Sequence, residues 1–289
     1  TLAQPYFQTK GRTLLVVCEE GEVEYDEELL KRTRTDLVVV EEQEDMTPAK
    51  LIEFDKFYKP ERILIEWNGM WNFKELKLPF HFSLEQQITM IDASTFVNYY
   101  TNMRSLLAEM VRNSELIIFN RCDGVLEELP NFKRNIKAVN QKADIIFEGS
   151  QGEITTIFEE DLPFDLNAPV IELDNEGYGI WYIDSLDNPD RYVGKTLRFK
   201  GIVMIPPEFP KGYFIPGRMA MTCCAEDMAF LGFACRYEGT GSLKERQWVE
   251  VTAKVTKEPF QAYGGEGPVL QALSVEPTKP PKQEVISFS

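Results

Sequence analysis

Two polar residues follow an apolar run in the stretch ELIIFNRCDG, residues 115–124, with the spacing Asn120-x-x-Asp123. A carboxylate at this position can accept hydrogen bonds from both the N1–H and the 2-amino group of guanine, a pairing that adenine cannot offer, while an asparagine reaches the base edge or ties neighbouring loops together. Any strand can also end in Asn and Asp, because both residues favour turns. The tetrapeptide alone leaves guanine recognition and a solvent-exposed turn as alternatives.

A second apolar run, LIEWNG, ends in Glu66 with Gly69 three residues later. A carboxylate there could hold magnesium through water, and a glycine allows its backbone N–H to approach a terminal phosphate closely. The alternative is a strand that simply runs into a turn.

The elements that must position these residues alternate between strands and helices. Helical spacing of apolar residues, with Thr47 as cap and Pro48 in the first turn, predicts a helix over 47–59. Strands are predicted at 13–21, 36–42, 62–69, 87–94, 115–123 and 143–149, and further helices at 95–114 and 131–142. This order predicts an α/β fold with a mostly parallel sheet and helices on both faces.

In such sheets function sits at the carboxyl ends of the strands. The polar groups at those ends are residues 18–21, 66–69, Asp92 and 120–123. We expect all of them along one edge of the sheet.

The sequence pattern changes near residue 188, within an acidic, proline-bearing connection over residues 159–190. We therefore predict one domain over residues 1–187 and a second over 188–289. The second contains short alternating strands separated by Gly and Pro turns, a pattern typical of a small β-barrel of the OB sort. The segment YGGEGPVL, residues 263–270, is interpreted as a hairpin loop, and TKPPKQEVISFS at the end of the sequence as an extended tail.

Composition limits the class of protein. The 289 residues carry a formal net charge of -16, which argues against nucleic acid as a partner, since that binding depends on basic side chains. No segment approaches the roughly 20 consecutive apolar residues that span a bilayer, so no membrane insertion is expected. Five cysteines without a signal peptide favour a soluble protein in the reducing cytoplasm.

Four strand ends in order resemble the CobW/HypB/UreG group of P-loop GTPases over residues 1 to about 150. CobW-like members carry N-E-x-G, E-T-S-G, V-D-A and N-K-x-D in succession, and this sequence has CEEG at 18–21, EWNG at 66–69, IDA at 91–93 and NRCD at 120–123. The resemblance implies a P-loop GTPase-like fold, with GTP and Mg²⁺ as ligands and guanine nucleotide as the small-molecule partner.

The resemblance also implies a role for each matching residue. Glu19 would lie near the phosphates and magnesium, and Glu66 and Gly69 would take the Walker B and γ-phosphate-sensing positions, with Glu66 also a magnesium ligand. Asn120 and Asp123 would read guanine. Arg121 would lay its stem along the base where the family has Lys, a substitution that keeps an aliphatic stem.

The sequence departs from the family in three places. It contains no G-x-x-x-x-G-K-[ST], the loop that cradles phosphates, which we interpret as an N-terminal truncation, with a genuine pseudo-GTPase as the alternative. If the central strand before that loop is missing, the sheet should show a gap or an unpaired edge. The family's C-x-C-C cluster is also absent, and Trp67 and Asn68 replace the hydroxyl residues of E-T-S-G.

Three cysteines gather in MTCCAEDMAFLGFACRY: Cys223, Cys224 and Cys235. Thiolates suit zinc, which makes Cys223 and Cys224 candidate metal ligands, but paired C-x-x-C spacings are missing, and unpaired cysteines packing a β-barrel are the alternative. This segment resembles the C-terminal domain of YcgQ-type proteins, in which a CCAAD-like stretch recurs. That resemblance implies a metal or transport theme, with a metal-receiving or membrane-permease protein as partner.

Two functions follow from these observations. The first is a GTP-binding protein of the CobW-like kind, a slow GTPase acting in metal handling or partner regulation, provided that the parent protein has the phosphate loop. The second is a non-catalytic, degenerate GTPase-like module that binds a protein or metal partner.

Overall fold

The computed structural model describes residues 11–18, 25–155, 162–221 and 228–287, which belong to two compact units, residues 1–87 and 88–289. Each unit is built from its own sheets, so each is described separately. The predicted domain division at residue 188 stays a prediction.

The first unit is a parallel three-stranded sheet in the order β2-β1-β3. Its strands are β1 (Thr13–Val17), β2 (Thr35–Val39) and β3 (Arg62–Glu66), and its helices are α1 (Glu27–Arg32) and α2 (Pro48–Tyr58), with 3-10 turns η2 (Gln43–Asp45) and η3 (Phe73–Glu75). All five residues of β1 are buried, because Leu51 and Phe54 of α2 pack on one face and Leu30 of α1 on the other. Helices on both faces of a parallel sheet are what the sequence predicted.

The predicted start of α2 is confirmed in detail. The hydroxyl of Thr47 accepts a hydrogen bond from the backbone N–H of Lys50 at 3.2 Å, and Pro48 occupies the first turn. Both features satisfy or avoid the free N–H groups at a helix start.

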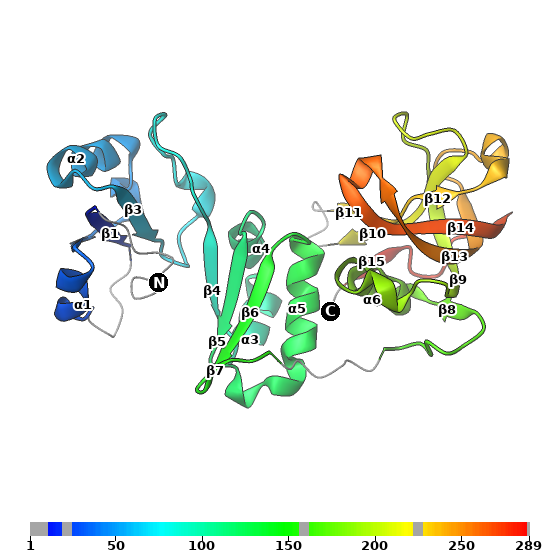
Figure 1. The fold of residues 1–289 in the computed structure, drawn as a ribbon, viewed down its shortest axis with the longest axis horizontal. Helices are drawn as coiled ribbons and strands as arrows, with labels where there is room; N and C mark the ends of the chain where they lie inside the picture. Colours follow the sequence, from blue (N-terminus) through cyan, green and yellow to red (C-terminus); the bar gives the residue numbers. More distant parts are fainter. Residues whose placement is uncertain (1–10, 19–24, 156–161, 222–227, 288–289) are drawn as a thin grey trace. The chain divides into compact units, whose positions relative to one another are not determined.

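The second unit begins with the sheet β4-β5-β6-β7 (Figure 1). Its elements are β4 (Ile88–Asp92), α3 (Phe96–Asn102), α4 (Arg104–Val111), β5 (Leu116–Asn120), η4 (Cys122–Gly124), η5 (Leu126–Glu128), α5 (Leu129–Val139), β6 (Asp144–Gly149) and β7 (Gly152–Glu153). The strands β4, β5 and β6 are parallel, and β7 is antiparallel. Phe119 of β5 lies at the core, with ring centroids 5.1 Å from Phe96, 5.8 Å from Phe132 and 5.1 Å from Phe147.

The strands expected in one sheet thus form two. Among the described residues β3 pairs only with β1, and β4 only with β5, so each sheet ends in an unpaired edge strand. The expectation that all the polar strand ends share one edge is corrected accordingly: 66–69 belong to the first sheet, and Asp92 and 120–123 to the second.

The rest of the second unit is strand-rich, and its strands form one eight-stranded sheet. The elements are β8 (Ile171–Leu173), α6 (Asn175–Asp187), η6 (Pro189–Arg191), β9 (Thr196–Met204), β10 (Tyr213–Met221), β11 (Met228–Leu231), β12 (Cys235–Arg236), η7 (Glu238–Ser242), β13 (Trp248–Phe260), η8 (Gln261–Tyr263), β14 (Gly265–Pro277) and β15 (Val285–Ser287). Because β9 pairs with both β13 and β10, the pairings β9-β10-β12-β14-β13 return to their starting strand. The hairpin loop predicted at 263–270 is shorter and lies earlier in the chain: the turn between β13 and β14 consists of η8 and Gly264, and residues 265–270 belong to β14.

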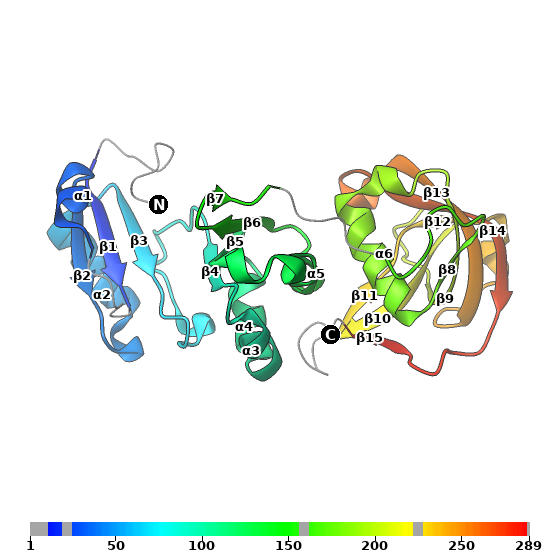
Figure 2. The same cartoon turned by 90° about the horizontal axis from the view of Figure 1, so that it is seen from below.

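Two stretches differ from their predictions. The predicted connection contains β8 and α6, and α6 lies against the C-terminal strands (Figure 2), with Tyr178 and Trp181 fully buried. The predicted extended tail contains β15, which pairs in parallel with β10. Arg218 of β10, only 2% exposed, holds this segment in place: its Nη2 donates to the carbonyl of Gln283 at 2.8 Å.

No helix in the described ranges is both long and apolar enough to cross a membrane.

Candidate functional site

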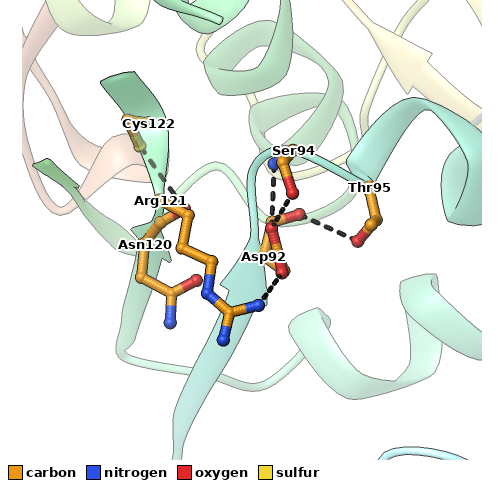
Figure 3. A network of polar contacts seen from close by, with 6 residues as sticks. All are labelled: Asp92, Ser94, Thr95, Asn120, Arg121 and Cys122. Carbon is orange, nitrogen blue, oxygen red and sulfur yellow. Dashed lines mark hydrogen bonds and ion pairs between the residues drawn. The ribbon is translucent and has the colours of Figure 1, made fainter. Parts of the chain in front are cut away.

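The ends of β4 and β5 bring Asp92 and Arg121 together. Asp92 is the register partner of Asn120 across the parallel pair, so its side chain reaches the residue that follows β5. Arg121 Nη1 donates to Asp92 Oδ2 at 2.7 Å (Figure 3). Asp92 Oδ1 in turn accepts from the backbone N–H of Ser94 at 2.9 Å and from its hydroxyl at 2.6 Å. Both oxygens of this carboxylate therefore have partners.

The electrostatics of Asp92 follow from those partners. Partial burial acts to raise the pKa of its carboxyl group, but the hydrogen bonds from Ser94 and Arg121, together with the positive charge of Arg121, outweigh it and lower the pKa. Asp92 is thus a carboxylate at neutral pH, which is the form that pairs with a guanidinium.

The backbone turns sharply at Arg121. Its φ of 54° lies in the left-handed region, where a non-glycine residue costs roughly 1–2 kcal/mol. Burial of the next residue compensates, since Cys122 is fully buried and its thiol donates to the carbonyl of Phe119 at 3.4 Å. The turn places Arg121 and Asp123 in solvent on either side of a buried anchor.

Asn120 extends from the last position of β5 next to Arg121 (Figure 3). Its Oδ1 is buried and has no hydrogen-bond partner among the described residues. An unsatisfied buried acceptor is unfavourable, so such groups in proteins call for a specific partner. This amide is therefore suited to receiving a donor from a ligand or from another loop.

Asp123 is exposed, and its carboxylate is oriented by a residue that the sequence did not indicate. The backbone N–H of Ser150 donates to Oδ2 at 2.9 Å, and the Ser150 hydroxyl donates to Oδ1 at 3.0 Å. Ser150 follows Gly149, the last residue of β6. An ionised carboxylate has about four acceptor positions, so Asp123 keeps capacity for further donors.

Glu66 and Gly69 lie in the first unit: Glu66 is the last residue of β3, and Gly69 follows three residues later. Glu66 is exposed, and its carboxylate accepts a hydrogen bond from the hydroxyl of Tyr25. Burial, and then the negative charge of Glu66, raise the pKa of the Cys18 thiol to about 12. Gly69 lies in the following turn, where the Asn68 side chain accepts from the N–H of Met70 at 2.8 Å.

The remaining predicted ligands cannot be placed. Glu19, Cys223 and Cys224 lie outside the described residues. Within the described ranges no three His, Cys, Asp or Glu side chains gather as a metal site, and Glu66 is engaged by Tyr25. The part of the chain that the structure describes thus shows no magnesium or zinc site, and the predicted ligands Glu19, Cys223 and Cys224 stay predictions.

Comparison with known proteins finds two matching family models. Residues 6–147 match the model of the CobW/HypB/UreG nucleotide-binding domain, and residues 150–286 match the model of the DUF1980 C-terminal domain. Residues 6–147 are thus similar to the nucleotide-binding domain of the CobW/HypB/UreG family, and residues 150–286 to the DUF1980 C-terminal domain. No curated protein matches it.

A search of solved structures returns the mitochondrial single-stranded DNA binding protein Rim1 of S. cerevisiae, at 12% identity, over 30% of this chain and 99% of that one. The TM-score of 0.20 is too low for this likeness to indicate fold or function.

The structure shows where two of the motifs that resemble the CobW family lie. The structure brings Asp92, Asn120, Arg121 and Asp123 to one edge of one sheet, and adds Ser94 and Ser150 to them. Ser94 had a local signal, because a serine two residues after an aspartate commonly donates back to it. Ser150 had none, since it is 27 residues from Asp123 in the sequence.

Proposed function

We propose that this chain binds guanine nucleotides through the carboxyl ends of β4, β5 and β6. The observation that carries the proposal is Asp123: an exposed carboxylate, fixed by two donors of Ser150, in the loop that follows β5. Guanine offers two adjacent donors on one edge, and a carboxylate offers two acceptors at matching spacing. The unpartnered Oδ1 of Asn120 and the exposed guanidinium of Arg121 lie on the same strand end.

In this proposal the selectivity between nucleotides comes from contacts to the base and not from contacts to the phosphates. The printed sequence holds no G-x-x-x-x-G-K-[ST] loop, so contacts to the phosphates contribute less than in a complete P-loop site. Guanosine should then compete for the site about as well as GDP does.

Hydrolysis belongs to the same proposal as a second step. Glu66 and Gly69 would act at the γ-phosphate, as the family motif implies, and turnover would be slow because positioning is most of what a phosphoryl-transfer site supplies. Regulation of a partner and metal handling follow from the family resemblance alone. The alternative is a degenerate module that binds without catalysis. Such a module would bind guanine nucleotides but would not hydrolyse GTP.

For the C-terminal domain we propose a small OB-type barrel. The support is the ring of pairings β9-β10-β12-β14-β13, in which β12 and β14 are parallel and the other pairs antiparallel.

Nucleotide titration of Asp123 variants tests the guanine assignment. Wild type should bind GDP in preference to ADP and inosine diphosphate by about tenfold, since a good bidentate pair is worth roughly 1–3 kcal/mol of discrimination. Asp123→Asn keeps one acceptor and gains a donor. The variant should therefore bind GDP more weakly and xanthosine diphosphate more tightly, because the base of the latter has a carbonyl in place of the 2-amino group.

Asp144→Asn is the matched control. Asp144 is also exposed, but it begins β6 at the opposite end of the strand. Guanine preference that survives Asp123→Asn, or that is lost equally in Asp144→Asn, would refute the assignment.

A further inference from the structure

The guanidinium of Arg121 is exposed to solvent, yet it is held in place by an ion pair with Asp92. Its side chain is 74% exposed, and within the described residues its hydrogen bond is the one from Nη1 to Asp92. A guanidinium has five N–H donors, so most of its donors stay available, and most of the side chain is open to solvent. An ion pair this exposed adds little to folding stability. The ion pair between Arg121 and Asp92 therefore matters mainly because it fixes the position of the Arg121 side chain.

Asp92 is itself fixed before it meets Arg121. The backbone N–H and hydroxyl of Ser94 occupy its Oδ1, which leaves Oδ2 directed at the guanidinium (Figure 3). The backbone of Asp92 is tied as well, since the hydroxyl of Thr95 donates to its carbonyl at 3.3 Å and the N–H of Ala93 donates to the carbonyl of Asn120 at 3.0 Å. The carboxylate thus links the ends of β4 and β5.

A fixed conformation of the Arg121 side chain would favour the binding of an aromatic ligand. A guanidinium is planar and stacks on aromatic faces, and an arginine that is already oriented loses less rotamer freedom when it does so. A purine is such a face, and stacking on it is tolerant of base identity because every base has a π-face.

We infer that Asp92 is a positioning residue, which orients Arg121 as a platform for the face of the purine while Asp123 reads its edge. The inference rests on the proposed function, and it separates two contributions within that site. The platform contributes affinity for any purine. The edge contributes preference for guanine.

The separation gives different outcomes for the two carboxylates. Asp92→Asn keeps the shape of the side chain but removes its charge, so it should lower affinity for GDP and for inosine diphosphate alike, by about three- to tenfold. The ratio of the two affinities should stay at the wild-type value. Asp123→Asn should change that ratio.

A double-mutant cycle tests whether Asp92 acts through Arg121. GDP and inosine diphosphate are titrated into wild type, Asp92→Asn, Arg121→Met and the double variant; Arg121→Met keeps the aliphatic stem and removes the guanidinium. Each single variant should weaken both ligands, and Asp92→Asn should cause no further loss in the Arg121→Met background. Glu172→Gln, which breaks the exposed pair between Glu172 and Arg198 at 2.9 Å, is the control and should leave both affinities unchanged.

Each outcome has one meaning. Unchanged affinity in Asp92→Asn overturns the inference, and so does an equal loss with and without Arg121, because Asp92 would then act on the loop alone. A wild type that binds both diphosphates equally, with both weakened by Asp92→Asn, overturns the guanine assignment and leaves the platform standing. A wild type that binds neither overturns both.

Discussion

A single methyl group added to Gly149 should displace the carboxylate of Asp123, the group that we propose reads guanine, without contacting the base itself. Gly149 ends β6, and a Cβ built on it would lie 2.7 Å from Oδ1 of Asp123 and 3.2 Å from its Cγ. Ordinary van der Waals contact begins near 3.4 Å, so the carboxylate must retreat by about 0.7 Å. The side chain of Asp123 is exposed and free to do so, which makes Gly149→Ala a change of position and not of fold.

The expected loss follows from that displacement. The hydrogen bonds from Ser150 to Asp123 are 2.9 to 3.1 Å long, and a shift of this size stretches or breaks them. Misplacing a positioned group by about 1 Å can cost up to a hundredfold, and the edge contact itself is worth roughly 1–3 kcal/mol. Because Asp123 is exposed, we expect a loss of about 1 kcal/mol, so that the roughly tenfold preference for GDP over inosine diphosphate falls to about twofold.

The assay is competition between GDP and inosine diphosphate for a fluorescent guanine nucleotide, with urea unfolding measured in parallel. Gly124→Ala is the control, because Gly124 follows Asp123 directly and an added Cβ would meet nothing within 4 Å. Gly124→Ala should keep the wild-type preference. The reasoning fails if Gly149→Ala keeps it too, or if its unfolding free energy falls so far that loss of fold explains the result.

Three further predictions concern stability. Gly217→Ala should destabilise the C-terminal domain by about 2 kcal/mol in urea unfolding, since its Cβ would lie 2.4 Å from the ring of Phe230. Asp187→Ala should cost about 1–2 kcal/mol in the same assay, because Lys137, whose side chain is 12% exposed, loses its carboxylate partner at 3.3 Å and keeps the carbonyl of Gln141 at 3.1 Å. The pKa of Asp92 is lowered in the folded state, so its contribution to stability is complete above about pH 4 and is lost as the pH falls further; unfolding measured from pH 6 to pH 2.5 should show a steeper acid loss in wild type than in Asp92→Asn.

Controls for these variants lie in the same domain. Gly241→Ala adds a methyl group that meets nothing within 4 Å and should leave stability nearly unchanged. Asp190 pairs with Lys257, but its side chain is 78% exposed, so Asp190→Ala should cost less than Asp187→Ala. Equal losses in either comparison would contradict the packing argument for Gly217 or the burial argument for Asp187.

The sequence was sufficient where local signals and burial agree. Strand β1 is an apolar run with every residue buried, and α2 has a cap at Thr47 and apolar residues at helical spacing. The loop after β5 was identified because polar residues there interrupt an apolar run. These features depend on neighbours a few positions apart, so a pattern along the chain records them.

Packing decided the features that the sequence did not predict. Helix α6 has aromatic and aliphatic residues on all sides and is buried on all sides, so it lacks the polar face by which a helix is recognised. The helix predicted over 95–114 ends and restarts at Met103, whose φ is −131°, with no Gly or Pro to mark the break. Ser150 reaches Asp123 only because β5 and β6 pair side by side.

The loop that follows β5 and the C-terminal domain are connected through α5. The chain runs from Asp123 through two short turns into this helix, and Phe132 of α5 stacks against Phe119 of β5 at 5.8 Å. On α5, Lys133 and Lys137 pair with Asp187 of α6 at 2.7 and 3.3 Å. Since α6 packs into the core of the C-terminal strands, the helix that fixes the loop is also held by the DUF1980 domain. That arrangement gives a physical reason for the two domains to occur in one chain: contacts of the second domain help to set the position of the loop that would read the base.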